Sequence, residues 1–423
     1  MDSVKITPSV LSGKVKVPPS KSFAHRAVLA AFLSGGECKI NNIRLSEDIS
    51  ATLDCAKALG AKFEYDTKKS SVLLSESTDK PSGKLRLNCG ESGSTLRFLI
   101  PIALCFSKSL EFTGRGRLME RPMKAYFDIF DEKGIKYSLK NGVLSVKGSL
   151  LSGDFKIDGS VSSQFITGLL FALPLLDGDS RIIIEGNLTS KGYIDITLDV
   201  LKKFGIKIEN DNYQIFTIKG NQQYKARNYT VEGDFSQAAF FLVAGAIGCD
   251  IICTGLKENS LQGDKAILDV IRRTGAEIEK VGTNGFKATS TANMCGITVD
   301  ADEIPDLVPI MAVLLAFCKG ESRIVNAARL RIKESDRLAA ICSELKELGA
   351  DITEGEDFLI INGVQVLSGS TVSSHNDHRI AMAAAIAACR CEGEVAIDGA
   401  NKSVRKSYPD FFKDYTKLGG ITE

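Results

Sequence analysis

The chain has 423 residues, of which 44 % are hydrophobic and 25 % charged, as is usual for a globular protein. A chain of this length exceeds what one hydrophobic core normally supports, so two domains of about 200 residues each are expected. The formal net charge of +1 argues against a nucleic-acid-binding protein, which normally carries a basic face or tail.

Membrane insertion, secretion and metal binding are not expected either. No apolar run approaches the roughly 18 residues that cross a bilayer, and the first ten residues lack the apolar stretch of a signal peptide. A cytoplasmic protein is therefore predicted. The eleven cysteines form no CxxC pair and only three histidines are present, which disfavours a zinc site or a disulfide framework. Most of the thiols should be buried as small hydrophobic groups.

The predicted elements follow one order along the chain. A strand at Lys14 to Val17 comes first, and then an apolar helix, a short strand, an amphipathic helix that ends in glycine, and a further strand. This order returns five times. The apolar helices lie within residues 20–36, 90–107, 162–178, 234–248, 304–320 and 376–393; the strands after them lie at 38–43, 109–114, 180–186, 250–255, 322–327 and 394–399; the amphipathic helices end at Gly60, Gly134, Gly205, Gly275, Gly349 and Gly419.

The terminal glycines lie 70 to 74 residues apart, and such a fixed spacing indicates repeated folding units. Each unit reads β-α-β-α-β-β. A helix that is apolar all round is buried, whereas an amphipathic helix keeps one face in water. The predicted fold class is therefore α/β (α+β), an inside-out α/β barrel with helices inside and sheets outside, built from six modules.

Six modules divide into three per domain. From the module boundaries, the chain should cross between the domains near Pro18 and again at Val231 to Gly233. The predicted domains are residues 1–18 with 233–423, and residues 19–232, with the active site in a cleft between them. The strand Lys14 to Val17 would then belong with the C-terminal half.

Polar residues gather at the starts of the apolar helices and in the loops before the amphipathic ones. Helix N-termini bind anions through unpaired N–H groups and a partial positive charge. Serine and aspartate at these places could simply be helix caps. Capping does not explain cations there, because the helix dipole disfavours them unless an anion is bound. Eight lysines and arginines occupy these starts: Lys21, Arg26, Arg97, Arg121, Lys333, Arg337, Arg379 and Lys406.

The motifs PPSKSFAHRA, GESGSTLRF, ERPM, SSQF, SKGYIDIT, IPD, RIKESDR, NDHR and VRKSYPDFF closely resemble the 5-enolpyruvylshikimate-3-phosphate synthase family, in that family's order from residue 18 to residue 412. The resemblance implies transfer of the enolpyruvyl group of phosphoenolpyruvate to the 5-hydroxyl of shikimate 3-phosphate, with release of phosphate, in aromatic amino acid biosynthesis. It also implies a two-domain fold that closes over its substrates. No cofactor or metal is expected, and the chain is expected to be a monomer.

Three residues carry the chemistry by this resemblance. Asp306 is the base for the hydroxyl proton, Glu334 gives and takes a proton at the methylene carbon, and Lys21 is a cation shared by both substrates. Both proton carriers must come within hydrogen-bond reach of the reacting atoms. The alternative for Asp306 is an N-cap of the apolar helix that follows it.

The other assigned residues hold the two anionic substrates. The planar fork of arginine suits a carboxylate, so Arg337 and Arg379 are apt clamps, and Gly93 lets an anion approach the backbone. Shikimate 3-phosphate is assigned to Lys21, Ser22, Arg26, Ser162, Ser163, Gln164, Ser190, Tyr193, Asp306 and Lys333. Phosphoenolpyruvate is assigned to Lys21, Gly93, Arg121, Gln164, Arg337, Arg379 and Lys406. Arg97, Ser94, Asp377 and His378 are expected to support these ligands from behind.

The chain departs from the family pattern in one stretch. Many relatives carry Asn-Ala-Gly-Thr where this chain has Glu91, Ser92, Gly93 and Ser94. The glutamate adds negative charge beside an expected anion site, and the family's sensitivity to glyphosate is not carried over to this chain. Arg329 replaces an asparagine of some relatives and is left out of the ligand set.

Two other functions remain open. The related enzyme that uses UDP-N-acetylglucosamine as acceptor usually has a reactive cysteine in the loop before its Arg-Pro, and the corresponding loop here, GRGRLMERPM, has none. A non-catalytic anion-binding scaffold would need the basic clusters but not the carboxylates Asp306 and Glu334. Both observations favour shikimate 3-phosphate and catalysis.

Overall fold

The computed structural model describes residues 3–76 and 83–423. Its internal contacts form two compact units: Lys21–Val231, here called the central unit, and Met1–Ser20 with Glu232–Glu423, here called the terminal unit. Each unit has its own hydrophobic core. Along the described ranges, no helix is both long and apolar enough to cross a membrane.

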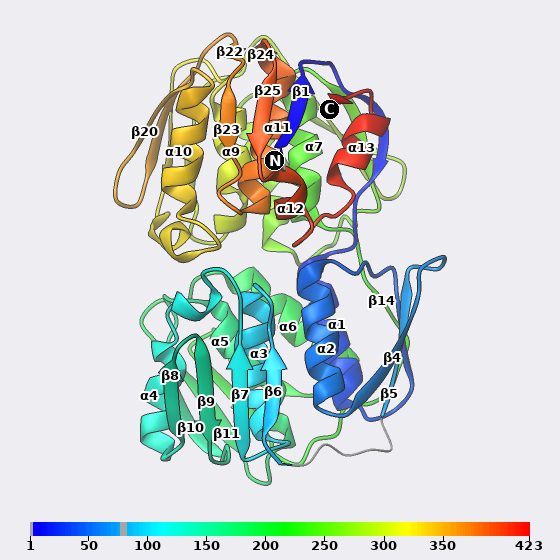
Figure 1. The fold of residues 1–423 in the computed structure, drawn as a ribbon, viewed down its shortest axis with the longest axis vertical. Helices are drawn as coiled ribbons and strands as arrows, with labels where there is room; N and C mark the ends of the chain where they lie inside the picture. Colours follow the sequence, from blue (N-terminus) through cyan, green and yellow to red (C-terminus); the bar gives the residue numbers. More distant parts are fainter. Residues whose placement is uncertain (1–2, 77–82) are drawn as a thin grey trace. The chain divides into compact units, whose positions relative to one another are not determined.

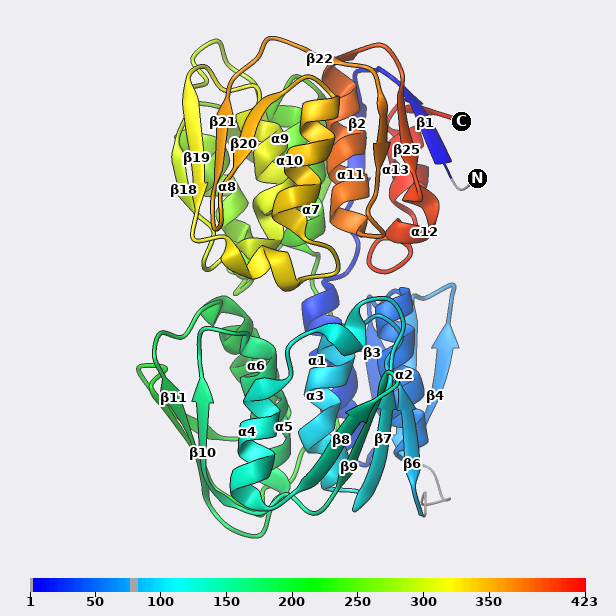
Figure 2. The same cartoon turned by 60° about the vertical axis from the view of Figure 1, so that its left-hand side comes forward.

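Within residues 21–76 and 83–231, the central unit contains three four-stranded sheets, each with one parallel and two antiparallel pairings. The sheets lie around the outside of the unit's helices (Figures 1 and 2). The sheet orders are β14-β3-β5-β4, β6-β7-β9-β8 and β10-β11-β13-β12, formed by β3 (Cys38–Asn41), β4 (Ala61–Asp66), β5 (Ser71–Glu76), β6 (Leu85–Asn88), β7 (Ser109–Thr113), β8 (Lys136–Lys140), β9 (Val143–Lys147), β10 (Gly153–Asp158), β11 (Ser180–Glu185), β12 (Ile208–Asp211), β13 (Ile215–Ile218) and β14 (Tyr229–Thr230).

The helices of the central unit alternate between buried and half-exposed, as the hydrophobic pattern predicts. Every residue of α3 except Ser94 is buried, and every residue of α5 except Gln164. The two helices pack closely because residue 168 is glycine: a Cβ there would lie 2.6 Å from the carbonyl oxygen of Arg97. The helices are α1 (Lys21–Leu33), α2 (Glu47–Ala58), α3 (Gly93–Leu104), α4 (Lys124–Lys133), α5 (Ser163–Ala172) and α6 (Lys191–Lys203).

The terminal unit repeats this arrangement. Its three apolar helices α7, α9 and α11 are buried along their whole length and pack against one another. The unit's helices are α7 (Phe235–Ala246), α8 (Ile267–Arg273), α9 (Val308–Leu315), α10 (Arg337–Glu347), α11 (His378–Ala387), α12 (Ala400–Val404) and α13 (Phe411–Lys417). Its strands are β1 (Ser3–Thr7), β2 (Ser12–Lys16), β15 (Asp250–Thr254), β16 (Glu277–Val281), β17 (Gly285–Thr289), β18 (Thr298–Asp300), β19 (Glu321–Val325), β20 (Asp351–Glu354), β21 (Leu359–Asn362), β22 (Leu367–Ser368), β23 (Thr371–Ser373), β24 (Cys391–Glu392), β25 (Val395–Asp398) and β26 (Ile421–Thr422).

These strands form three four-stranded sheets, β16-β17-β15-β2, β18-β19-β21-β20 and β23-β25-β1-β26, and the pair β22-β24. Strand β2 precedes α1 in the sequence but pairs in parallel with β15, which follows α7. Strand β14 precedes α7 but pairs in parallel with β3, which follows α1. The first and fourth modules thus exchange their first strands. The prediction that the strand at Lys14 to Val17 joins the C-terminal half is confirmed for β2.

The repeated glycines end the amphipathic helices for a backbone reason. All six have positive φ, between 68° at Gly134 and 107° at Gly60, where a side chain would be strained. Nine of the eleven cysteines are buried, which agrees with their predicted role as small hydrophobic groups.

Candidate active site

Arg337 is the centre of a charged cluster in the terminal unit. It is the first residue of α10, and its side chain is 1 % exposed. The guanidinium donates through Nη1 to Oδ1 of Asp306 at 2.9 Å, through Nη2 to Oε2 of Glu334 at 2.7 Å, and through Nε to Oδ2 of Asp377 at 2.8 Å. One buried cation therefore gathers three of the acidic residues predicted from the sequence.

Two further predicted cations converge on Asp306. Arg379 donates through Nη2 to Oδ2 of Asp306 at 3.0 Å and through Nη1 to its backbone carbonyl at 2.8 Å. The Nζ of Lys333 lies 3.5 Å from Oδ1 of Asp306. The arginines that the resemblance assigns to a substrate carboxylate thus hold carboxylates of the protein itself.

The alternative interpretation of Asp306 as a helix cap is wrong. Asp306 lies inside the 3-10 turn η4 (Pro305–Leu307), and the residue at the N-cap of α9 is Leu307, without a capping side chain. The side chain of Asp306 is 21 % exposed. It is therefore a partly accessible acid held by two guanidinium groups.

Asp377 does cap its helix, and it also supports the cluster. Its Oδ1 accepts the backbone N–H of Arg379 at 2.9 Å, and its Oδ2 accepts the hydroxyl of Ser335 at 3.1 Å as well as Arg337. His378 is 1 % exposed, with Nδ1 3.7 Å from Asp377. Lys406 lies after α12 and donates to the carbonyl of Asn376 at 2.5 Å.

Burial changes the proton affinity of two groups here. It lowers the pKa of Lys333 to about 8, against the opposing effect of Asp306. Burial, with the charge of Asp306 as second cause, raises the pKa of Asp264 to about 7. Asp264 was not predicted from the sequence. Its place in the loop before an amphipathic helix, where the other site residues occur, is the signal that could have identified it.

In the central unit, Lys21 begins α1 and donates to Oδ2 of Asp48 on α2 at 2.9 Å. Asp48 is 8 % exposed and was also not predicted. In the sequence it resembles an ordinary acid in the first turn of a helix, where the dipole favours it. The contact shows that the predicted shared cation is held by a carboxylate from the neighbouring helix.

Arg26 is buried, with 2 % exposure, and its donors are used within the protein. Its Nε donates to the hydroxyl of Thr197 at 2.8 Å, and its Nη1 to the carbonyl of Ser22 at 2.8 Å. Its Nη2 donates to the carbonyl of Tyr193 at 3.1 Å. Arg26 thus ties α1 to α6, and both helices carry predicted ligands.

Gly93, Arg121 and Gln164 lie against one another. A Cβ at Gly93 would be 2.7 Å from Nη1 of Arg121 and 3.5 Å from Oε1 of Gln164, so a side chain there would displace the guanidinium of Arg121. Gln164 donates to Oγ of Ser94 at 3.0 Å and accepts from Nη1 of Arg97 at 2.8 Å. Arg97 thus supports Gln164, which lies against Gly93.

The remaining predicted residues lie at the starts of α5 and α6. Ser162 is the N-cap of α5 and accepts the N–H of Gln164 at 3.3 Å, so the capping interpretation holds for this residue. Ser163 follows as a buried first helical residue. Ser190, before α6, has φ 58°, which is uncommon for a residue with a side chain and occurs often at functional sites. Tyr193 is the third residue of α6.

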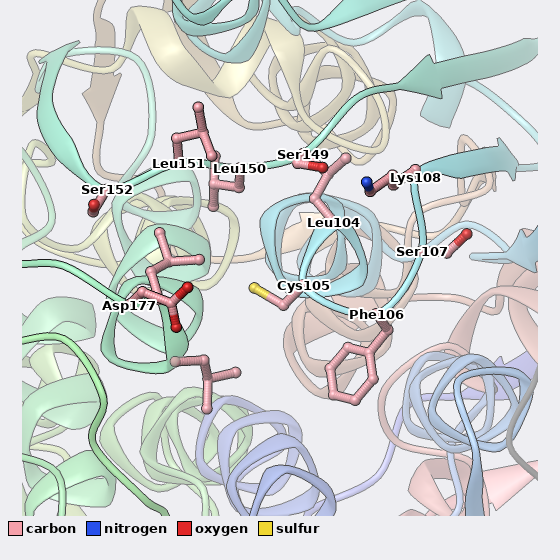
Figure 3. Close-up of a pocket in the computed structure, with 12 residues that line it drawn as sticks. Leu104, Cys105, Phe106, Ser107, Lys108, Ser149, Leu150, Leu151, Ser152 and Asp177 are labelled. Carbon is pink, nitrogen blue, oxygen red and sulfur yellow. The ribbon is translucent and has the colours of Figure 1, made fainter.

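A surface cavity of about 390 Å³ lies elsewhere in the central unit (Figure 3). Its lining includes Leu104, Cys105 and Phe106 at the C-terminal end of α3, together with Leu150 and Asp177. Twelve helical residues span about 18 Å, so the cavity is about that far from Gly93 at the other end of the helix. None of the predicted site residues lines it.

Known proteins resemble the chain over its whole length. A family model described as EPSP synthase (3-phosphoshikimate 1-carboxyvinyltransferase) matches residues 6–415. The 3-phosphoshikimate 1-carboxyvinyltransferase of Clostridium novyi (strain NT) is 52 % identical, covering 100 % of this chain and 99 % of the relative. The protein of the same name from Clostridioides difficile (strain 630) is 50 % identical, over 99 % of this chain and 98 % of the relative.

Solved structures show the same fold. The structure of EPSP synthase from Acinetobacter baumannii has a TM-score of 0.81 at 25 % identity, over 100 % of this chain and 99 % of that one. The enolpyruvyl transferase NikO from Streptomyces tendae has a TM-score of 0.81 at 17 % identity, over 100 % of this chain and 98 % of that one. The second likeness concerns the fold alone. The predicted α/β architecture of repeated modules is confirmed.

Proposed function

Because the chain belongs to the EPSP synthase family, we propose that it transfers the enolpyruvyl group of phosphoenolpyruvate to the 5-hydroxyl of shikimate 3-phosphate and releases phosphate. The proposal includes a cytoplasmic monomer that needs no cofactor. The observation that carries it is the cluster in which Arg337 and Arg379 hold Asp306 beside Lys333 and Glu334.

The cluster suits the two steps of the reaction. In the first step the hydroxyl oxygen bonds to C2 of phosphoenolpyruvate, the hydroxyl proton passes to Asp306, and the methylene carbon receives a proton from Glu334. In the second step phosphate leaves from C2 and the methyl carbon returns a proton to Glu334, which restores the double bond. Both steps are general acid and base catalysis by positioned carboxylates.

The cations would stabilise the charges of both substrates. We propose that the carboxylate of phosphoenolpyruvate takes the donors of Arg337 and Arg379 that Asp306 accepts from in this structure. A carboxylate that loses two charge-assisted hydrogen bonds is a stronger base, so substrate binding would activate Asp306. Lys333 would meet shikimate 3-phosphate, and Lys406 phosphoenolpyruvate.

The central unit would supply the other half of the ligands. Lys21, Arg121 and Gln164 present cationic and amide donors at or near helix starts, where anions bind readily. We propose that the shikimate 3-phosphate set also includes Ser22, Arg26, Ser162, Ser163, Ser190 and Tyr193, and that Gly93 allows phosphoenolpyruvate to approach the backbone.

The alternative acceptor, UDP-N-acetylglucosamine, is not favoured, because the family model and the named relatives agree on the shikimate reaction. A scaffold without catalysis does not need Asp306 and Glu334 on one arginine. The two alternative functions predict different activities. The related enzyme would turn over the UDP sugar, and the scaffold would turn over neither acceptor.

The test is a coupled assay of phosphate release with purified protein and each acceptor. Turnover with shikimate 3-phosphate is expected for the wild type, and Asp306→Asn should lower it by about 10²- to 10⁴-fold, the usual contribution of a general base. Calorimetric affinity for shikimate 3-phosphate should change less than tenfold. Asp302→Asn, on the same loop but paired with Arg329, is the matched control and should stay near the wild type. Turnover with the UDP sugar alone, or full activity of Asp306→Asn, would contradict the proposal.

A further inference from the structure

The turn Cys89 to Gly93 is joined by backbone hydrogen bonds to the end of β7 and to the start of the loop at residues 114–121. The N–H of Cys89 donates to the carbonyl of Thr113 at 2.9 Å, and the N–H of Arg115 donates to the carbonyl of Gly90 at 2.7 Å. The turn and the start of the loop are therefore held together. Glu91 is the next residue of the turn.

The carboxylate of Glu91 lies directly on the loop. A Cβ built at Gly116 would be 3.0 Å from both Cδ and Oε2 of Glu91. Gly116 also has φ 56°, a conformation that residues with side chains rarely adopt. Both facts disfavour a side chain at residue 116, because its backbone would be strained and its Cβ would push the Glu91 carboxylate away from the loop.

The same loop returns to the turn five residues later. After the 3-10 turn η1 (Leu118–Glu120), the Nη1 of Arg121 lies 2.7 Å from where a Cβ of Gly93 would be. The turn thus contacts the loop at two places, through Glu91 at Gly116 and through Gly93 at Arg121. A displaced residue 116 would move Arg121 relative to Gly93.

The contact between Glu91 and the loop also brings opposite charges together. Residues 114–121 carry three arginines, Arg115, Arg117 and Arg121, and one acid, Glu120. Glu91 is an acid on the facing turn, and its side chain is partly buried, where opposite charges are screened less than in water. The extra negative charge noted in the sequence therefore faces a cationic loop.

We propose that Glu91 is a positioning residue that holds the loop at residues 114–121 and so places the guanidinium of Arg121 beside Gly93 for the anionic substrate. The inference rests on the proposed function, in which Arg121 binds phosphoenolpyruvate. Glu91 does not touch the substrate. Its removal should weaken binding of phosphoenolpyruvate without changing the chemical steps.

The test compares Glu91→Ala and Glu91→Gln with the wild type in the phosphate-release assay, with each substrate varied in turn. The KM for phosphoenolpyruvate should rise about 5- to 30-fold in Glu91→Ala, which corresponds to a loss of 1 to 2 kcal/mol. The kcat and the KM for shikimate 3-phosphate should stay within about twofold. Gly116→Ala, whose Cβ pushes the Glu91 carboxylate away, should raise the KM for phosphoenolpyruvate in the same way. It replaces Glu91→Ala in the test if that variant does not fold.

Glu47→Ala is the matched control, because Glu47 is an exposed acid 4.0 Å from Arg115 of the same loop and exposed pairs contribute little. It should leave both KM values within about twofold. In an Arg121→Ala background, Glu91→Ala should add less than twofold, since the two residues act through one contact. Equal changes in both KM values, an unchanged KM for phosphoenolpyruvate, or additive effects would overturn the proposal. A wild type without turnover would instead refute the proposed function.

Discussion

Asp377→Asn should destabilise the terminal unit strongly. Asp377 is fully buried, and its Oδ2 accepts both Nε of Arg337 and the hydroxyl of Ser335. Asparagine could keep the cap through its oxygen at Oδ1, where the N–H of Arg379 donates, but its NH₂ would then face the Nε–H of Arg337, which cannot accept a hydrogen bond. The substitution therefore removes the charge and sets donor against donor.

The magnitude follows from burial. Breaking a buried ion pair by removing one partner costs about 3 to 5 kcal/mol, because a charge is left in the interior without compensation. Arg337 keeps Asp306 and Glu334, whose side chains are about one fifth exposed, so a loss near the lower end, about 3 kcal/mol, is expected. This is a large part of the roughly 5 to 15 kcal/mol that stabilises a domain.

Hydrogen exchange of the full chain can assign the loss to one unit, since amides of α11 report on the terminal unit and amides of α5 on the central unit. Only the α11 amides should lose protection in Asp377→Asn. Glu321→Gln, which removes an exposed partner of Arg323, is the control and should change stability by less than about 0.5 kcal/mol. A loss below about 1 kcal/mol for Asp377→Asn would refute the view that this pair supports the cluster.

Two pH effects follow from the same region. Burial lowers the pKa of Lys333 to about 8, so kcat/KM for shikimate 3-phosphate should fall as pH rises above 8. In Lys333→Arg, kcat/KM should not change over this pH range, since arginine keeps its proton. An identical fall in both proteins would exclude Lys333 as the group whose titration lowers kcat/KM. The hydrogen bond to Glu344 raises the pKa of His375. Its stabilisation is therefore complete below the unfolded pKa of about 6.5 and is lost as pH rises through the higher folded value. His375→Gln should lower the unfolding midpoint more at pH 6 than at pH 9, and the reverse order would contradict this sign.

The repeated modules were predictable because their signals are local. An apolar circumference, a cap within three residues and a glycine at a helix end depend only on neighbours in the sequence. The unusual presence of cations at helix starts is also visible from neighbouring residues in the sequence. Lys21, Arg337 and Arg379 all lie in the first turn of a helix, as expected.

The partners of these cations were not predictable from spacing. Asp48 reaches Lys21 from another helix, and Arg337 gathers Asp306 and Asp377 from segments 31 and 40 residues away. Such contacts depend on how helices pack, which no local pattern specifies. The sequence therefore predicted cations and carboxylates in the same group of residues, but not that they bind one another.

By itself, the sequence determined the number of modules, the buried and half-exposed helices and the residue types at the candidate site, because hydrophobic periodicity and turn chemistry act over a few residues. The tertiary structure alone decided that β1 lies between β25 and β26, that the Glu91 carboxylate rests on Gly116, and that Asp306 is held by two arginines. These features join residues distant in the chain, and their free energy comes from packing and desolvation, which exist only once the chain has folded.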